Sequence, residues 1–250
     1  MTDPKSTGSQ PTHTDSAAGA AAESHGGAIP VARSVDRFTS HGHSIAVDCF
    51  VPEGAGRVAA VIALHGSGGG HGSIASDPAA RLAAQGFAVF VPHYFDRTGT
   101  TAVADRGTIF RNFAAWGKTV WDAIGWVSAR AEVDPERIGL MGFSLGGYLA
   151  LSVASVDPRV RAVVEFFGGF PKEMKLFMRR MPPVLILHGD ADTSVPVDEA
   201  YHLQQVLESR KVAYEMKIYP GAGHGFSGEV WRDAGRRTLA FLNQHLAAAG

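Results

Sequence analysis

The chain of 250 residues has a single cysteine, no long apolar run and no excess of charge of either sign. Cys49 alone cannot form an internal disulfide, and no Cys or His cluster has the spacing of a zinc site, so we expect no metal and a reducing compartment, the cytoplasm. No segment approaches the roughly 18 apolar residues of a membrane-spanning helix. Lysine and arginine number 23 against 24 aspartates and glutamates, which argues against nucleic acid or a membrane as partner.

Residues 1–30 differ in composition from the rest of the chain. They have no Leu, Phe, Tyr or Trp that could anchor them in a core, and they lack the basic start and apolar run of a secretory signal. We therefore expect a disordered tail at 1–30. The remaining residues, 31–250, are enough for one domain with one substantial core.

Strand and helix patterns alternate along residues 31–250. Residues 37–40 and 45–51 flank His41-Gly42-His43, as two strands of an antiparallel hairpin would, and the apolar run 58–64 is typical of a strand buried on both faces. Further strands are predicted at 87–92, 137–142, 160–167, 184–188 and 214–219. Helices are predicted at 77–85, 109–131, 197–211, and from 144 and 229 onward. This order predicts an α/β fold, a doubly wound and mostly parallel sheet with helices on both faces.

The sequence Gly142-Phe143-Ser144-Leu145-Gly146 matches the G-x-S-x-G pattern of a nucleophile elbow. The pattern alone also fits an ordinary glycine turn. Here it follows an apolar strand and opens an apolar helix, which is the context that an elbow requires. Ser144 is therefore the candidate nucleophile.

A serine hydroxyl is a weak nucleophile, so it needs a base that is oriented by a third group. After such an elbow the acid and the histidine follow in loops at the carboxyl ends of later strands. His224, in Gly221-Ala222-Gly223-His224, is the histidine at such a position. The loop at 188–196 offers two carboxylates, Asp190 and Asp192, and His188 there is expected to bond backbone.

Two backbone N–H groups are also needed to hold an oxyanion. The residue after the nucleophile, Leu145, and Ser67 in the Gly-rich loop at 66–70 fit these places. A phosphate cradle is the alternative for that loop, but it lacks the lysine of a P-loop. We therefore expect an oxyanion hole made by the amides of Ser67 and Leu145.

Several of these motifs occur together in one known family. The stretches at 65–69, 133–139, 142–147, 188–196 and 221–224 resemble the dienelactone hydrolase family, over about residues 35–248. The resemblance implies the α/β-hydrolase fold, with Asp192 as the catalytic acid and Asp190 as a bystander. It also places Arg97 where dienelactone hydrolases hold the substrate carboxylate.

The sequence departs from that family in ways that bear on its substrate. Dienelactone hydrolases use a cysteine nucleophile and a glutamate in the oxyanion loop, whereas this chain has Ser144 and, at the loop position, Gly66. A second substrate-binding arginine is expected shortly after the histidine, but Phe226 stands there instead and becomes a candidate substrate contact. The resemblance therefore supports the fold and the triad more than the dienelactone substrate.

We expect a serine hydrolase that cleaves small carboxylic esters or lactones through an acyl-serine, without a cofactor. The segment between Gly168 and Pro183 is too short for a large lid, so an open cleft is expected. A dienelactone hydrolase proper, an acyltransferase and a non-catalytic binding protein of the same fold are the alternatives. The sequence does not indicate an oligomeric state.

Overall fold

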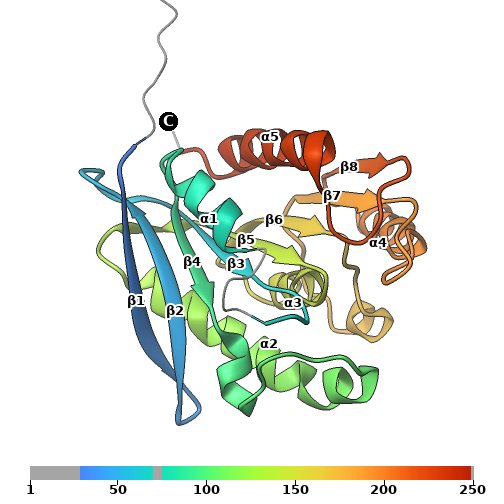
Figure 1. The fold of residues 1–250 in the computed structure, drawn as a ribbon, viewed down its shortest axis with the longest axis horizontal. Helices are drawn as coiled ribbons and strands as arrows, with labels where there is room; N and C mark the ends of the chain where they lie inside the picture. The colour runs from blue at the N-terminus through green and yellow to red at the C-terminus, as the bar shows by residue number, and fades with distance from the viewer. Residues whose placement is uncertain (1–28, 70–74, 249–250) are drawn as a thin grey trace, which may run out of the picture.

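The computed structural model describes residues 29–69 and 75–248. The predicted tail, apart from Ile29 and Pro30, lies outside them. Eight strands form one sheet in the order β1-β2-β4-β3-β5-β6-β7-β8 (Figure 1). Their bounds are β1 Val31–Ser40, β2 His43–Pro52, β3 Val58–Leu64, β4 Ala88–Pro92, β5 Val133–Phe143, β6 Val160–Phe166, β7 Val184–Gly189 and β8 Tyr214–Tyr219.

The sheet is mostly parallel. β1 pairs with β2 and β2 with β4 in antiparallel fashion, while β3 is parallel to both β4 and β5, and β5 to β8 continue in parallel. The carboxyl ends of the parallel strands therefore meet at one edge, which is where doubly wound sheets place their sites. The predicted fold class is confirmed.

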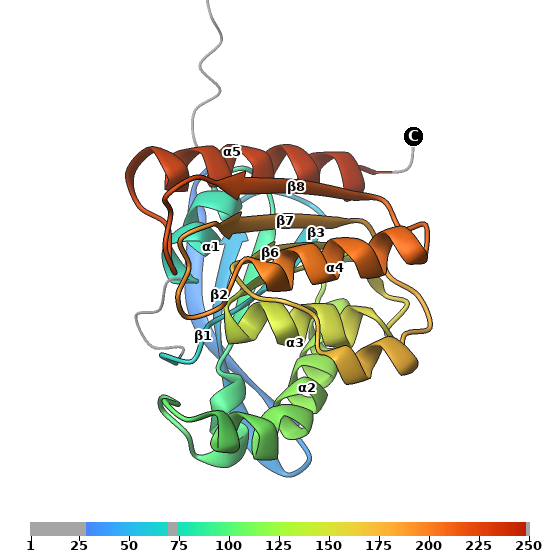
Figure 2. The ribbon, with the colours of Figure 1, turned by 90° about the vertical axis from the view of Figure 1, so that its right-hand side faces the viewer.

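Helices cover both faces of the sheet (Figure 2). α1 (Ser76–Ala83) and α5 (Gly228–His245) lie on one face, and α2 (Arg106–Ser128), α3 (Leu145–Ala154) and α4 (Asp198–Ser209) lie on the other. Because side chains of a strand alternate between faces, each strand contributes to two cores. In β3, Val61 packs with α1 and α5, whereas Ile62 packs with α2 and α3.

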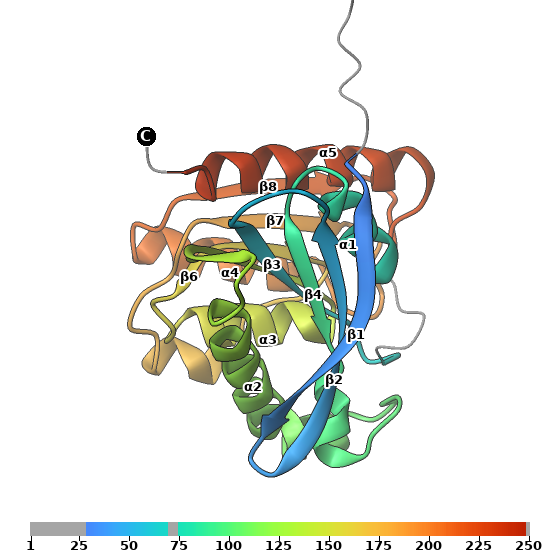
Figure 3. The same ribbon diagram turned by 90° about the vertical axis from the view of Figure 1, so that its left-hand side faces the viewer.

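The edge hairpin is longer than its sequence pattern predicted, because β1 pairs with β2 along its full length. Its far end reaches α2 (Figure 3), where the Phe38 and Trp126 rings stack at 5.9 Å and the Ser40 hydroxyl donates to Asp122 at 2.7 Å. Two short 3-10 helices, η1 (Tyr94–Thr98) and η2 (Lys172–Leu176), complete the described elements.

Most elements begin or end within about four residues of the prediction, and two of the shifted starts have a clear local cause. α2 begins at Arg106 rather than 109, because the Asp105 side chain caps it by accepting a hydrogen bond from the Thr108 amide at 2.8 Å. β5 begins at Val133, because that residue already pairs with Val58 of β3. Neither difference moves the carboxyl end of a strand, so the placement of the candidate site is unaffected.

Candidate active site

Ser144 lies at the carboxyl end of β5 on a sharp turn, with φ of 54° and ψ of −117°, directly before α3. Non-glycine residues rarely adopt this backbone conformation, and such strain is typical of a nucleophile elbow. The flanking residues must be glycines, because neighbouring backbone atoms leave no room for a side chain. A Cβ at Gly142 would lie 2.2 Å from the Gly146 carbonyl oxygen, and one at Gly146 would lie 2.3 Å from the Leu64 carbonyl oxygen.

The β6 strand holds the elbow in place from its other side. The Ser144 amide donates to the carbonyl oxygen of Phe166 at 2.9 Å, at the end of that strand. Ser144 itself remains partly exposed. Its hydroxyl therefore stands at a rigid and accessible point of the sheet edge.

His224 and Asp192 complete a linear arrangement with Ser144. The His224 Nε2 is 3.0 Å from the Ser144 Oγ, and its Nδ1 is 2.8 Å from the Asp192 Oδ2. With the carboxylate at Nδ1, the neutral imidazole carries its proton there and leaves Nε2 free to accept one. The His224 side chain is 27% exposed, so a bound molecule could reach it.

Asp192 is held by backbone donors inside the protein. Its side chain is fully buried, and its Oδ1 accepts hydrogen bonds from the amides of Ser194 and Val195 at 2.8 and 2.9 Å. Together with His224 this gives the carboxyl group three hydrogen-bond donors, which fix its position. The Asp192 carboxylate is therefore suited to orient His224.

Asp190, the other candidate acid, has a different partner. Its Oδ1 accepts a hydrogen bond from the Gly221 amide at 2.6 Å. It thereby ties the loop after β7 to the loop that carries His224. Of the two carboxylates, the structure brings Asp192 to the histidine and gives Asp190 a structural bond.

His188 supports the loop that contains Asp192. Its Nε2 donates to the Val195 carbonyl oxygen at 2.9 Å and lies 3.6 Å from the Asp192 Oδ2, while its Nδ1 has no hydrogen-bond partner. Burial lowers the pKa of this imidazole, which favours its neutral form. His188 therefore has the backbone contact that was expected of it.

The candidate oxyanion loop lies against Ser144. A Cβ at Gly66 would be 3.4 Å from the Ser144 Cβ, so this loop passes close to the nucleophile. Leu145 is the first residue of α3, and an amide in that position has no acceptor within its helix. These placements are compatible with an oxyanion hole at Ser67 and Leu145, whose role stays a prediction.

Aromatic packing fixes the start of that loop. The His65 ring stacks on Tyr94 with 4.1 Å between centroids, and the Tyr94 hydroxyl donates to the His65 carbonyl oxygen at 2.7 Å. The Ser67 carbonyl oxygen accepts from the Val103 amide at 2.8 Å. The described part of the loop is thus tied to η1 and to the segment that follows it.

The expected substrate contact at Arg97 is not supported by its placement. The 3-10 turn of η1 directs the guanidinium to the end of β1, where it donates to the Ser40 carbonyl oxygen at 2.9 Å. Ser40 is itself bonded to Asp122 of α2. Arg97 therefore ties η1 to the hairpin, and the structure does not bring it to Ser144, Asp192 and His224.

Phe226, in contrast, is connected to the histidine through one intervening ring. Its ring packs edge-on against Phe167 at 5.1 Å between centroids, and Phe167 packs edge-on against the His224 ring at 5.0 Å. Phe167 has a φ of 40°, which is rare for a residue of this kind and marks a constrained turn after β6. The sequence pattern did not single out Phe167 as a neighbour of the histidine.

A second buried carboxyl group, Glu165, was missed by the sequence analysis. It is fully buried at the end of β6, where its Oε1 accepts a hydrogen bond from the Gly168 amide. Burial, and to a smaller degree the nearby Asp192, raise its pKa to about 8. The signal was a charged residue within an otherwise apolar end of a strand, at Val163-Val164-Glu165-Phe166.

Neither a metal site nor a membrane segment can be assigned within the described residues. Among residues 29–69 and 75–248, no three His, Cys, Asp or Glu side chains gather as they would around a metal ion. In the same part of the chain, no helix combines the length and the apolar character of a bilayer-spanning segment.

The sheet order, the elbow after β5 and the loops after β7 and β8 define the α/β-hydrolase fold. The solved structure of a provisionally named dienelactone hydrolase from Klebsiella pneumoniae superposes with a TM-score of 0.75 at 24% identity, over 86% of this chain and 99% of that one. An esterase from Thermogutta terrifontis superposes with a TM-score of 0.69 at 20% identity, over 87% and 95%.

The chain belongs to the dienelactone hydrolase family, because the sequence profile of that family matches residues 45–243. The expected family is thereby confirmed. A relative from Yersinia pestis, provisionally named a carboxymethylenebutenolidase, is 29% identical over 195 residues, which is 68% of this chain and 72% of the relative. This chain covers about 60% of the length of similar relatives from Salmonella typhimurium and Escherichia coli.

Proposed function

We propose that the protein is a serine hydrolase of carboxylic esters or lactones, with Ser144 as nucleophile, His224 as general base and Asp192 as the orienting acid. The observation that carries this proposal is the continuous chain of contacts, 3.0 Å from Ser144 to His224 and 2.8 Å from His224 to Asp192. Both lengths are within the range in which a proton can be passed directly.

The first half of the reaction forms an acyl-enzyme. The Ser144 Oγ attacks the carbonyl carbon of the substrate while His224 Nε2 takes the hydroxyl proton. The negative charge on the substrate oxygen is held by the amides of Leu145 and Ser67. The tetrahedral intermediate then breaks the bond to the alcohol oxygen, which leaves with the proton from His224.

The second half releases the acid. A water molecule gives a proton to His224 and attacks the acyl carbon, and the bond to Ser144 breaks as the serine oxygen recovers that proton. Throughout both halves Asp192 remains ionised and keeps the imidazole in the required tautomer. Substrate, water and protein groups balance the reaction, so it needs no cofactor.

Esters and simple lactones are favoured over the dienelactone of the family name. Arg97 is engaged with Ser40, and Phe226 stands close to the position of the second expected arginine. The apolar ring of Phe167 packs against His224 instead, and the ring of Phe226 packs against Phe167. A small substrate with an uncharged, apolar acyl or alcohol group fits these surroundings better than a dicarboxylate-like one.

Labelling with a fluorophosphonate, followed by intact mass, tests the activated serine. We expect one adduct on the native chain and none on Ser144→Ala. The matched control is Ser227→Ala, because Ser227 is exposed beside the histidine loop and its side chain makes no cap bond with α5. Absence of an adduct on a folded native chain, or an adduct that persists in Ser144→Ala, would contradict the proposal.

A further inference from the structure

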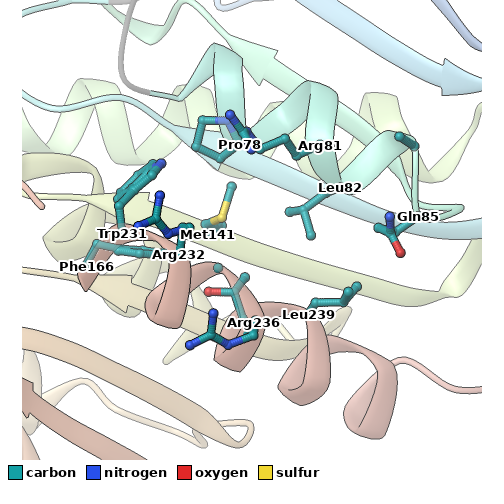
Figure 4. Close-up of a pocket in the computed structure, with 13 residues that line it drawn as sticks. Pro78, Arg81, Leu82, Gln85, Met141, Phe166, Trp231, Arg232, Arg236 and Leu239 are labelled. Carbon is teal, nitrogen blue, oxygen red and sulfur yellow. The ribbon is translucent and has the colours of Figure 1, made fainter. Parts of the chain in front are cut away.

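A groove with a volume of about 510 Å³ lies between α1 and α5 (Figure 4). This volume is within the range of small-molecule sites, roughly 300–1,000 Å³. None of the three triad residues lines it. Its floor and walls are apolar side chains from β5, β6, α1 and α5, namely Met141, Phe166, Leu82, Trp231 and Leu239.

The groove is elongated along α5. Its lining residues on that helix run from Trp231 to Leu239, and the helical rise over these residues gives a length of about 12 Å. Figure 4 shows the facing residues of α1 and of the turn after it spread in the same direction, from Pro78 to Gln85. The shape suits a linear apolar chain better than a compact ring system.

The charged residues that line the groove are all arginines. Arg81, Arg232 and Arg236 contribute, and no aspartate or glutamate of the described residues is part of the lining. Arg232 and Arg236 pair along α5 with Glu229 and Asp233, but these are exposed pairs, which contribute little energy and can rearrange. Within residues 29–69 and 75–248, Arg81 has neither an ion pair nor a hydrogen bond. An anionic group at the rim would complement this charge.

We propose that the groove between α1 and α5 is a binding site for a medium-chain, unbranched carboxylate. The alkyl chain lies along Leu82, Trp231 and Leu239, and the carboxylate lies at the arginine rim. A neutral alkane would leave the arginines unused, and a small polar anion would leave the apolar walls in water. This site is separate from the triad and does not depend on the proposed hydrolysis.

Gly235 offers a substitution that fills the site without damaging the fold. It lines the groove, and a Cβ there would meet no heavy atom within 4 Å. Replacing glycine inside a helix also removes a helix-destabilising residue. Gly235→Leu should therefore occupy the space that the alkyl chain needs, while Gly235→Ala is the matched control that leaves the space open.

The test is calorimetric titration with sodium decanoate, below the concentration at which it forms micelles. We expect saturable binding to the native chain and to Gly235→Ala, and binding at least about tenfold weaker to Gly235→Leu, because its side chain excludes the ligand. Decanol, which has the same chain without the charge, should bind about tenfold more weakly than decanoate, because it cannot pair with the arginines.

The controls separate this site from the triad, where a carboxylic acid could also bind. Binding should persist in Ser144→Ala and in native chain whose Ser144 has been labelled. Loss of binding on labelling, or equal affinity for native chain and Gly235→Leu, would place the decanoate elsewhere and overturn the proposal. The proposal would also be overturned if the chain self-associates and binds no decanoate, because a second copy would then occupy the groove.

Discussion

Two buried carboxyl groups stand at the carboxyl ends of neighbouring strands, Glu165 at the end of β6 and Asp192 just after β7. The side chains of both are withdrawn from solvent. Asp192 accepts hydrogen bonds from two backbone amides and the His224 imidazole. Among the described residues, Glu165 accepts only from the Gly168 amide, and its Oε2 has no partner there. The two groups have the same burial and very different sets of donors.

A buried carboxyl group with few donors is the case in which burial favours the neutral form. Burial raises the pKa of Glu165 to about 8, so this group is mostly protonated at neutral pH. Glu165 lies close under the elbow, since a Cβ at Gly147 would be 3.3 Å from its Cγ. A negative charge on Glu165 would oppose the oxyanion of the proposed tetrahedral intermediate, which forms on the substrate oxygen.

The largest expected effect concerns Asp192, the member of this pair that contacts His224. Asp192→Asn keeps the shape but presents an amide to His224, which favours the wrong tautomer. We expect kcat for an ester substrate to fall by about 10⁴-fold, as in the serine-protease precedent. Asp190→Asn is the matched control, and its kcat should change by less than about tenfold. A large loss in Asp190→Asn with little change in Asp192→Asn would reverse the assignment of the acid.

The raised pKa of Glu165 should be measurable in the pH dependence of the free energy of unfolding. Glu165 has a pKa of about 8 in the folded chain against an ordinary value of 4.5, so the folded state binds more protons than the unfolded one. Stability should therefore decrease as the pH rises from about 4.5 to 8 and level off above it. Glu165→Gln removes this dependence, because the amide does not titrate.

Urea unfolding of the native chain and Glu165→Gln at pH 5 and pH 8 measures the effect. The free energy of unfolding of the native chain should fall, relative to the variant, by up to about 4 kcal/mol over this interval. The comparison uses the change with pH, so any constant cost of burying the amide cancels. A difference between the two proteins that stays the same at both pH values would show that Glu165 is ionised throughout.

The elements that depend on local pattern were predictable from the sequence. The strands β3 and β8 have the predicted bounds, and Gly142 and Gly146 flank Ser144 because backbone atoms leave no room for a side chain there. These features depend on residues close together in the chain or on general rules for parallel sheets. Asp192 was preferred to Asp190 only through the family resemblance, since both occupy the same loop.

Contacts between distant segments were not predictable. The direction of the Arg97 side chain is set by its bond to the Ser40 carbonyl oxygen, 57 residues earlier in the chain. No local sequence pattern encodes this contact. The charge state of Glu165 depends on how many donors the turn at Phe167 and Gly168 offers it. The hydrogen bond from the Gly221 amide to Asp190 also joins residues far apart in the chain, with a separation of 31 residues. Side-chain direction and protonation therefore required the tertiary structure.

The smallest expected effect comes from the support behind Asp192. His188→Leu removes the donor to the carbonyl oxygen of Val195, a partly buried residue. We expect a loss of about 1 kcal/mol in the free energy of unfolding, with a small fall in kcat as the acid loop loosens. His188→Gln should recover most of this loss, because its amide nitrogen can donate from nearly the same place as Nε2. If Leu and Gln at this position were equally stable, packing rather than the hydrogen bond would be what His188 contributes to the loop.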